Sequence, residues 1–259
     1  MTYISMCSGI EAASSAYIPL GWIPVAFSEI EKFPCKVLAY HHPNIPNHGD
    51  FTAFDWSIYR GAIDVLVAGT PCQAFSVAGL RNSLADARGN LTLEFIRAAN
   101  AIQPRFIIWE NVPGVLSTSD NAFGCFLAGL VGCNEPIVAK QGWPNAGVVH
   151  GPERAACWRV LDAQYFGLAQ RRKRVFVVAS PRGEPNPAEV LFEWESLRRH
   201  TPPSREAWKG IAAYSPSSIG GYSEGIGSLR ANGGDIGGGS ESLITCALDV
   251  PQRGGHGTD

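Results

Sequence analysis

The fold of this chain is constrained most by a regular alternation of short apolar runs with longer stretches of helical spacing. The apolar runs are rich in Val, Ile and aromatic residues and end in polar or glycine residues, as strands do. Strands separated by helices of this length form βαβ units, so the pattern predicts an α/β fold with a mostly parallel sheet and helices on both faces. We expect strands over residues 2–6, 23–29, 63–69, 105–111 and 174–180, and helices over 11–21, 30–42 and 90–102.

The composition fits a large core and excludes several classes of protein. The chain has 259 residues, of which 45% are hydrophobic. It has no run near the ~18 apolar residues of a membrane helix, and its N-terminus lacks the basic and apolar regions of a secretory signal. Seven cysteines without a CxxC pair argue against a disulfide framework and a zinc site. We therefore expect a cytoplasmic protein with no metal and no membrane partner.

The amino-acid composition of the chain changes after Pro181. The stretch "SPRGEPNPAE" has the composition of a linker, and the chain beyond Ala212 is rich in glycine and serine. This change predicts a cofactor-binding catalytic domain over residues 1–182. Residues 183–259 would form a linker and a loop-rich region.

Polar landmarks fall where the first strands end, which is where parallel sheets bind ligands. In "SMCSGIEAA", Ser8 and Gly9 give a corner of small residues that lets a ligand approach backbone N–H groups. Glu29 ends the second strand, where a carboxylate suits a ribose diol, although a solvated strand-end carboxylate is the alternative. Asp50, in "NHGDF", suits an adenine amine or a plain helix cap. Together these residues indicate a pocket for a nucleoside.

A cysteine and a glutamate stand at the ends of two further strands. Cys72 follows Pro71 in "GTPCQAFS", at the mouth of a loop, where burial as a small hydrophobe is less expected. Its thiol needs help to become a nucleophilic thiolate at neutral pH. Glu110 ends the apolar strand "IIWEN", and we expect it in apolar surroundings that favour its protonated form. A thiolate beside a carboxylic acid suggests addition to an electron-poor ring carbon, with the acid stabilising the charge on the ring nitrogen.

These residues form an ordered series that resembles the cytosine-C5 DNA methyltransferase family. The resemblance extends from about Tyr3 to Ala179 and includes a Pro-Cys-Gln, a Glu-Asn-Val and a Gln-Arg-x-Arg motif at suitable distances. The stretches that carry it are "SMCSGIEAA", "FSEIE", "NHGDF", "GTPCQAFS", "ARGNLTLEFIR", "WENVPG" and "YFGLAQRRKRVFVVA".

The resemblance implies a Rossmann-like S-adenosylmethionine-dependent methyltransferase fold that acts on a flipped cytosine in double-stranded DNA. Cys72 would attack C6 of the base, Glu110 would bind its N3 and amine, and Arg172 and Arg174 would contact the flipped nucleotide. Asn111 would hold the loop, and residues 74–90 would form the lid. The implied cofactor contacts are Cys7, Ser8, Gly9, Ile10, Glu29, Ile30, Asp50, Phe51, Pro71 and Leu91. The implied substrate contacts are Gln73, Ser76, Arg81, Asn111 and Gln170.

Because the chain as a whole is slightly negative, any binding to DNA must come from local clusters of basic residues. The net charge is −2, and the basic runs are "RRKR" at residues 171–174 and "RRH" at 198–200. A charge run is commonly a solvated face. Alternation along a strand would place Arg172 and Arg174 on one face, and beside the expected site that face suits phosphate or a base oxygen.

The chain also departs from the pattern of the family. Cys7 stands where the family usually has Phe, and Glu11 where it has Gly, as in phage and prophage relatives. Nothing after the glycine-rich stretch resembles the ninth motif or the closing helix, so we expect a truncated chain, a monomer, with an incomplete target-recognition region. A catalytically impaired or dead remnant that binds cofactor or DNA is the main alternative. A methyltransferase for RNA or a small molecule, and a cysteine hydrolase that pairs Cys72 with His150, are further alternatives.

Overall fold

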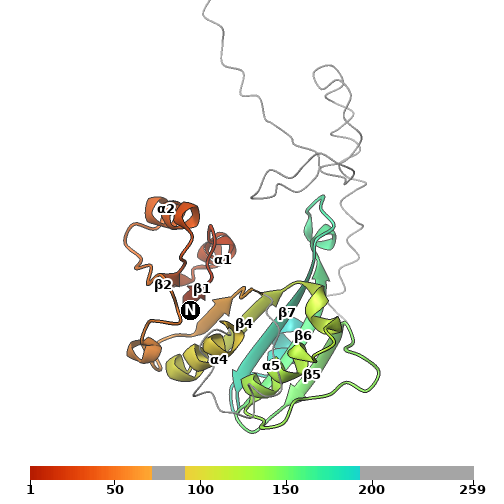
Figure 1. Ribbon diagram of the computed structural model, residues 1–259. Helices are drawn as coiled ribbons and strands as arrows, with labels where there is room; N and C mark the ends of the chain where they lie inside the picture. The colour runs from red at the N-terminus through yellow and green to blue at the C-terminus, as the bar shows by residue number, and fades with distance from the viewer. Residues whose placement is uncertain (72–90, 193–259) are drawn as a thin grey trace, which may run out of the picture. The chain divides into compact units, whose positions relative to one another are not determined.

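The computed structural model describes residues 1–71 and 91–192 of the chain (Figure 1). The described residues form one seven-stranded sheet in the order β2-β1-β3-β4-β7-β6-β5. The strands are β1 (Thr2–Met6), β2 (Ile23–Ser28), β3 (Val65–Ala68), β4 (Phe106–Asn111), β5 (Ala146–His150), β6 (Arg154–Asp162) and β7 (Lys173–Pro181).

The sheet is mixed, and its first half is the parallel one. β1 pairs in parallel with β2 on one side and β3 on the other, and β3 pairs in parallel with β4. β7 runs antiparallel to β4, and β5 antiparallel to β6. The four parallel strands therefore end at one edge, and the chain order reverses between β1 and β3. This reversal is the place where open α/β sheets bind ligands.

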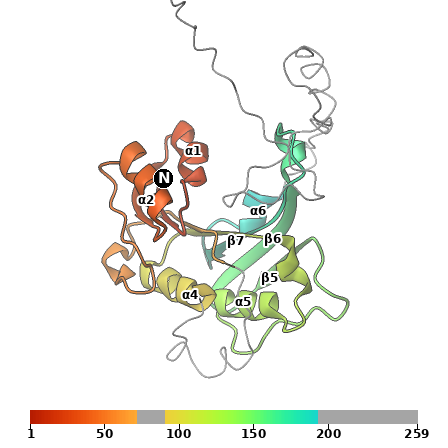
Figure 2. The same cartoon turned by 45° about the horizontal axis from the view of Figure 1, so that its top comes forward.

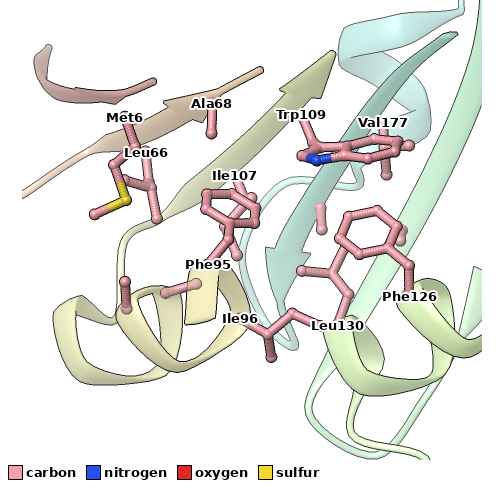
Figure 3. Close-up of a cluster of buried hydrophobic side chains, with 14 of the residues drawn as sticks. Met6, Leu66, Ala68, Phe95, Ile96, Ile107, Trp109, Phe126, Leu130 and Val177 are labelled. Carbon is pink, nitrogen blue, oxygen red and sulfur yellow. The ribbon is translucent and has the colours of Figure 1, made fainter. Parts of the chain in front are cut away.

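Helices cover both faces of the sheet because successive strand residues point to opposite sides. On one face, α4 (Leu91–Ile102) and α5 (Ala122–Val131) pack on the larger hydrophobic cluster, in which Phe95 and Phe126 meet Ile107 (Figures 1 and 3). On the other face, α1 (Ala12–Tyr17), α2 (Lys32–His41) and α6 (Pro187–Leu191) contribute to a second cluster around Tyr3 and Phe27 (Figure 2).

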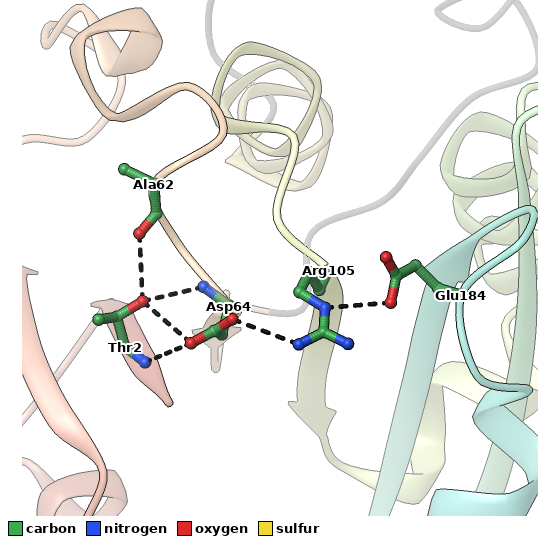
Figure 4. Close-up of polar contacts among 5 residues, drawn as sticks. All are labelled: Thr2, Ala62, Asp64, Arg105 and Glu184. Atoms are coloured by element: carbon green, nitrogen blue, oxygen red, sulfur yellow. Dashed lines mark hydrogen bonds and ion pairs between the residues drawn. The ribbon is translucent and has the colours of Figure 1, made fainter.

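A polar network joins the strands at the edge opposite to the parallel carboxyl ends (Figure 4). The Thr2 backbone N–H donates to Asp64 Oδ2 at 2.7 Å, and the Asp64 N–H donates to Thr2 Oγ1 at 3.1 Å. Arg105 Nη1 lies 3.6 Å from Asp64 Oδ1, and its Nε donates to Glu184 Oε2 at 3.0 Å. The network therefore connects the starts of β1, β3 and β4 with the segment that follows β7.

The expected strands and helices are confirmed, with local differences that have physical causes. The first helix is split: α1 ends at Tyr17, and the short 3-10 helix η1 (Ile18–Leu20) carries Pro19 in its first turn and closes at Gly21 with φ 77°. The end of the stretch expected to be a linker lies in α6, which Asn186 caps by accepting from the Ala188 N–H. The elements α5, β5 and β6 were not predicted from the sequence. The remaining 3-10 helices are η2 (Trp56–Tyr59), η3 (Pro113–Ser117) and η4 (Ala163–Phe166).

The chain divides into two compact units. The first comprises Met1–Leu161 and Lys173–Arg199, and the second comprises Asp162–Arg172 and His200–Asp259. The described part of the second unit is residues 162–172, which contain η4. The division expected at residue 182 stays a prediction, and the glycine-rich stretch lies outside the described residues. Across the ranges that the structure describes, no helix has the length and apolar character needed to span a bilayer.

Candidate cofactor site and active site

The turn after β1 has an unusual backbone. Cys7, Gly9 and Glu11 all adopt left-handed conformations, with φ of 52°, 56° and 68°. Such a conformation costs about 1 kcal/mol or more for a residue with a side chain, so the surroundings must hold Cys7 and Glu11 in place. The buried Glu11 carboxyl provides part of this hold, because its Oε1 accepts from the Ser14 N–H at 3.0 Å and caps α1.

Glu29 connects this turn to the end of β2. Its Oε2 accepts from the Gly9 N–H at 2.7 Å, and its Oε1 accepts from the N–H groups of Ile30 and Glu31, both at 2.8 Å. The residue is only 9% exposed. The alternative of a solvated strand-end carboxylate is therefore wrong. Among the described residues, the Gly9 N–H is the donor to Oε2, which leaves this oxygen able to accept a further hydrogen bond from a hydroxyl group.

Asp50 is far from Glu29 in sequence but lies near it in the fold, because the Gly49 carbonyl accepts a hydrogen bond from Ser28. Asp50 itself forms a local turn. Its Oδ1 accepts from the N–H of Thr52 at 2.9 Å and from the Thr52 hydroxyl at 2.8 Å. No helix begins here, since η2 starts at Trp56 and is capped by Asp55, so the helix-cap alternative is wrong. The residue is exposed. Phe51 is buried in the larger cluster, and its carbonyl accepts from Trp56 Nε1. The Phe51 side chain is thus part of the core.

The electrostatics of this edge suit a cation. Burial, and then the negative charges of Glu29 and Asp50, raise the pKa of the Cys7 thiol to about 12, so this cysteine stays a neutral thiol. Ile10 and Ile30 are 62% and 66% exposed, and each adjoins one of the loops that Glu29 joins. Carboxylates with exposed apolar side chains nearby fit a cofactor with a positively charged sulfonium and a flat apolar base.

The end of β3 is held by two side chains of β4. Trp109 Nε1 donates to Thr70 Oγ1 at 2.9 Å, and Asn111 Nδ2 donates to the Thr70 carbonyl at 2.9 Å. All three residues are buried. Since Pro71 is the next residue, this pair of hydrogen bonds fixes the backbone that leads to Cys72. The expectation that Asn111 holds the loop stays a prediction, because that loop lies outside the described residues. No role was predicted for Thr70 or Trp109.

Glu110 lies against the end of β3 and forms an ion pair. Its Oε1 is 2.8 Å from Arg174 Nε, and a Cβ atom added at Gly69 would lie 3.4 Å from its Oε2. We expected a carboxyl enclosed by apolar groups, but its side chain is 32% exposed and paired with a guanidinium. The difference arises because β7 lies beside β4, in an antiparallel position that the sequence pattern does not reveal.

The other expected site residues are distributed as follows. Ser8 Oγ donates to the Ser5 carbonyl within the turn after β1, Pro71 is exposed, and Leu91 begins α4. Cys72, Gln73, Ser76, Arg81 and the expected lid lie outside the described residues.

Arg172 precedes the strand that carries Arg174, and the expectation that both face the flipped nucleotide stays a prediction. β7 begins at Lys173, and Arg172 belongs with Gln170 to the second unit, where its N–H donates to Asp162 Oδ1 at 3.2 Å. His150, the residue that the hydrolase alternative requires, ends β5. Three strands separate β5 from β3, which disfavours that alternative. The described residues contain no group of three metal-ligating side chains.

The fold is that of known methyltransferases. The structure of Spodoptera frugiperda DNMT2 (an E260A/E261A/K263A mutant) matches 75% of this chain and 52% of its own, with a TM-score of 0.51 and 18% identity. The S. pombe Dnmt2 methyltransferase matches 75% of this chain and 51% of its own, with a TM-score of 0.50 and 14% identity. These similarities confirm the Rossmann-like methyltransferase fold.

The sequence comparisons define the family. The model of the C-5 cytosine-specific DNA methylase family matches residues 1–218, so the chain belongs to this family, as its motifs predicted. Membership supports S-adenosylmethionine as the cofactor expected for this family.

Individual relatives differ in their names. The Type II methyltransferase M.Eco47II of Escherichia coli is 32% identical over 69% of this chain and 39% of its own length. A protein of Escherichia phage P1 named DNA N-6-adenine-methyltransferase is 48% identical over 97% of this chain and 36% of its own length. The chain thus spans less than two-fifths of the length of either relative.

Proposed function

We propose that the chain transfers a methyl group from S-adenosylmethionine to C5 of a flipped cytosine in duplex DNA, through a covalent bond between Cys72 and C6. The observation that supports this most is the arrangement at the ends of β3 and β4. Glu110, paired with Arg174, lies against the strand end from which Thr70 and Pro71 lead to Cys72. This brings a carboxyl group and the start of the Pro-Cys-Gln motif to the same edge of the sheet.

The proposed reaction assigns one task to each group. The Cys72 thiolate forms a bond with C6, and Glu110 in its protonated form donates a hydrogen bond to N3, so that the electron pair displaced onto the ring is stabilised there. The electron pair of the C5–C6 double bond would then form a bond to the methyl carbon, and S-adenosylhomocysteine would leave with the electron pair of the broken sulfur–carbon bond. Loss of the C5 proton to a base and departure of the thiolate restore the double bond and free the enzyme. The cofactor supplies an electrophilic methyl group, and Glu29 and Asp50 would hold its nucleoside.

Duplex DNA is the proposed partner, in the cytoplasm of a bacterial or phage-infected cell. A base in a duplex cannot reach such a site unless it is extruded, which costs a few kcal/mol. Because the net charge of the chain is −2, local basic groups such as Arg174 would provide the attraction, and binding should weaken as salt rises.

Adenine N6 is a second candidate target because of the name of the phage P1 relative. Methylation at N6 proceeds by direct attack of the exocyclic amine and needs no thiol. The Pro-Cys-Gln and Glu-Asn-Val motifs of this chain would then have no chemical purpose. Cytosine is therefore the better-supported target, and the two products are chemically distinguishable.

The decisive experiment analyses the product and the intermediate together. Phage and bacterial genomic DNA lacking methylation would be incubated with the chain and labelled cofactor, digested to nucleosides and analysed by mass spectrometry. We expect 5-methyldeoxycytidine. With duplexes that contain 5-fluorocytosine, C5 has no proton to lose, so we expect a covalent adduct that survives denaturation and maps to Cys72.

Two variants make the result specific. Cys72→Ser should abolish both the product and the adduct, whereas Cys133→Ser, which changes another free thiol, should leave both intact. N6-methyldeoxyadenosine as the only product would refute the cytosine proposal. Cofactor binding without any methylated nucleoside or adduct would establish the remnant alternative.

A further inference from the structure

Asn47 occupies a position between the two loops that carry the expected cofactor contacts. Its Oδ1 accepts from the Glu29 backbone N–H at 2.9 Å, and its Nδ2 donates to the Glu29 carbonyl at 3.1 Å. The side-chain amide thus satisfies both backbone groups of Glu29, as a neighbouring strand would do. The same Oδ1 accepts from the Gly49 N–H at 3.2 Å, so the amide also reaches the residue before Asp50.

The backbone around Asn47 continues this strand-like contact. The Phe27 N–H donates to the Pro46 carbonyl at 2.8 Å, and the His48 N–H donates to the Phe27 carbonyl at 2.9 Å. Phe27 and Asn47 accordingly form an isolated parallel bridge at the open side of β2. The segment therefore runs beside the end of β2 and delivers Asp50 next to Glu29.

Glu29 depends on this support because β2 ends at Ser28. Beyond that residue no strand hydrogen bond of β2 fixes the backbone of Glu29, and the Asn47 amide takes over that role. Cys35 adds a weaker contact, with its Sγ donating to the same Glu29 carbonyl at 3.1 Å. With its backbone held, Glu29 can direct its carboxylate to the Gly9 N–H. This hydrogen bond joins the turn after β1 to the loop after β2.

We propose that Asn47 is a positioning residue for the nucleoside part of the cofactor, which acts by fixing Glu29 and, through Gly49, Asp50. This inference rests on the proposed function, since it takes Glu29 and Asp50 to be the nucleoside contacts. In this role Asn47 acts through Glu29 and Asp50. The role requires an amide, because only a group with both a donor and an acceptor can serve the two backbone groups of Glu29 at once.

The test measures the binding of S-adenosylhomocysteine and S-adenosylmethionine to the full chain by isothermal titration calorimetry. Asn47→Ala should raise Kd about tenfold, which corresponds to the loss of one or two hydrogen bonds that order the site. Asn47→Asp keeps the acceptor but loses the donor and adds a negative charge near the Glu29 carbonyl, so it should also raise Kd. In methylation assays, KM for the cofactor should rise while kcat at saturating cofactor stays within about twofold.

A double-mutant cycle tests whether Asn47 acts through Glu29. Glu29→Ala should weaken binding by itself, and Asn47→Ala in that background should change Kd by less than about twofold. Asn186→Ala is the matched control, since Asn186 also caps backbone with its side chain but lies after β7, which runs antiparallel to β4 and ends at the opposite edge. It should leave Kd unchanged.

The outcomes separate this inference from the proposed function. If the unaltered chain does not bind the cofactor, the proposed function fails. If the unaltered chain binds but Asn47→Ala changes Kd by less than twofold, Asn47 does not position Glu29. The same conclusion follows if the factors by which Asn47→Ala and Glu29→Ala raise Kd multiply in the double variant, because the two residues then act independently. Should Asn47→Ala unfold at a lower temperature but bind with an unchanged Kd in its folded fraction, the residue is structural only and the inference is overturned.

Discussion

The surroundings of Thr70 show how much a single position can contribute to the geometry of the site. The hydroxyl and the carbonyl of this residue are each held by a separate side chain of β4, and neither is exposed to water. A buried polar group that loses its partner costs about 1–3 kcal/mol, so rearrangement at this point is unfavourable. Thr70, which precedes Pro71, is therefore held firmly in place.

Trp109→Phe should separate this local role from general stability. The variant keeps an aromatic ring against Phe126 but removes the donor to Thr70, and we expect kcat for methylation to fall about tenfold. Trp158→Phe is the control, because Trp158 is equally buried in the same cluster and also donates one hydrogen bond, to the Pro144 carbonyl. Both variants should lose about 1–3 kcal/mol of stability in urea titrations. Equal effects on kcat would show that the Thr70 contact has no specific role.

At the level of residues, the sequence predicted those contacts whose chemical type is conspicuous at a strand end. Glu29 and Glu110 stand out because a carboxylate follows an apolar run, and both lie at the predicted edge. Asn47 and Thr70 could not be predicted in the same way, since each acts on the backbone of a segment remote in sequence. A small polar residue in a loop carries no signal of that pairing until the fold is known.

Among the elements, α5 depends on an exceptionally close contact. Gly124 lies in the first turn of this helix, and a Cβ atom there would be 2.0 Å from the Ile137 carbonyl oxygen and 2.5 Å from Asn121 Nδ2. The Ile137 N–H also donates to the Gly124 carbonyl. The segment that leads to β5 is thus packed directly on the backbone of the helix, where only glycine fits.

Gly124→Ala should destabilise the chain although alanine favours helices by about 1 kcal/mol over glycine. The collision is with backbone, which must move, so we expect a net loss of about 1–3 kcal/mol in the free energy of unfolding, measured by urea titration. Gly114→Ala is the control, because its Cβ would come no closer than 4.0 Å to another residue. It should change stability by less than about 0.5 kcal/mol. A neutral Gly124→Ala would mean that the helix and the segment at Ile137 are not in contact.

The elements that the sequence predicted are those whose pattern is local. The parallel strands and α4 have clear apolar runs or one apolar face, and the structure contains them all. The stretch "AFGCFLAGLV" of α5 is apolar throughout, so it has no helical periodicity, and Ala122 to Val131 are buried except Gly129. β7 was predicted as a strand, but its antiparallel place beside β4, which brings Arg174 to Glu110, depends on long-range pairing.

At the scale of the whole first unit, the two edges of the parallel strands serve different purposes. At the carboxyl edge the chain has left-handed turns and short loops that present Glu29, Asp50 and Glu110. At the amino edge, Asp64 and Arg105 connect three strand starts and the segment after β7. A stable amino edge lets the loops of the other edge keep strained conformations, since the strands that carry them are fixed at their origins.

Acid should weaken this amino edge in a way that Asp64 controls. The hydrogen bond from the Thr2 backbone N–H, and more weakly Arg105, lower the pKa of Asp64 from 3.8. Because the folded pKa is below the unfolded one, the stabilisation is complete above pH ~4 and is lost as pH falls through the folded pKa. Asp64→Asn should therefore be about 1 kcal/mol less stable than the unaltered chain at pH 7, and this difference should shrink below pH ~4.

Urea titrations of both proteins at pH 7, 5 and 3 would measure this difference, and the effects of other carboxyl groups cancel in the comparison. Thr52→Ala, which removes the hydroxyl that donates to the exposed Asp50, should show a smaller difference at pH 7. A difference for Asp64→Asn that stays constant down to pH 3 would show that the ionised carboxylate does not hold the strand starts together.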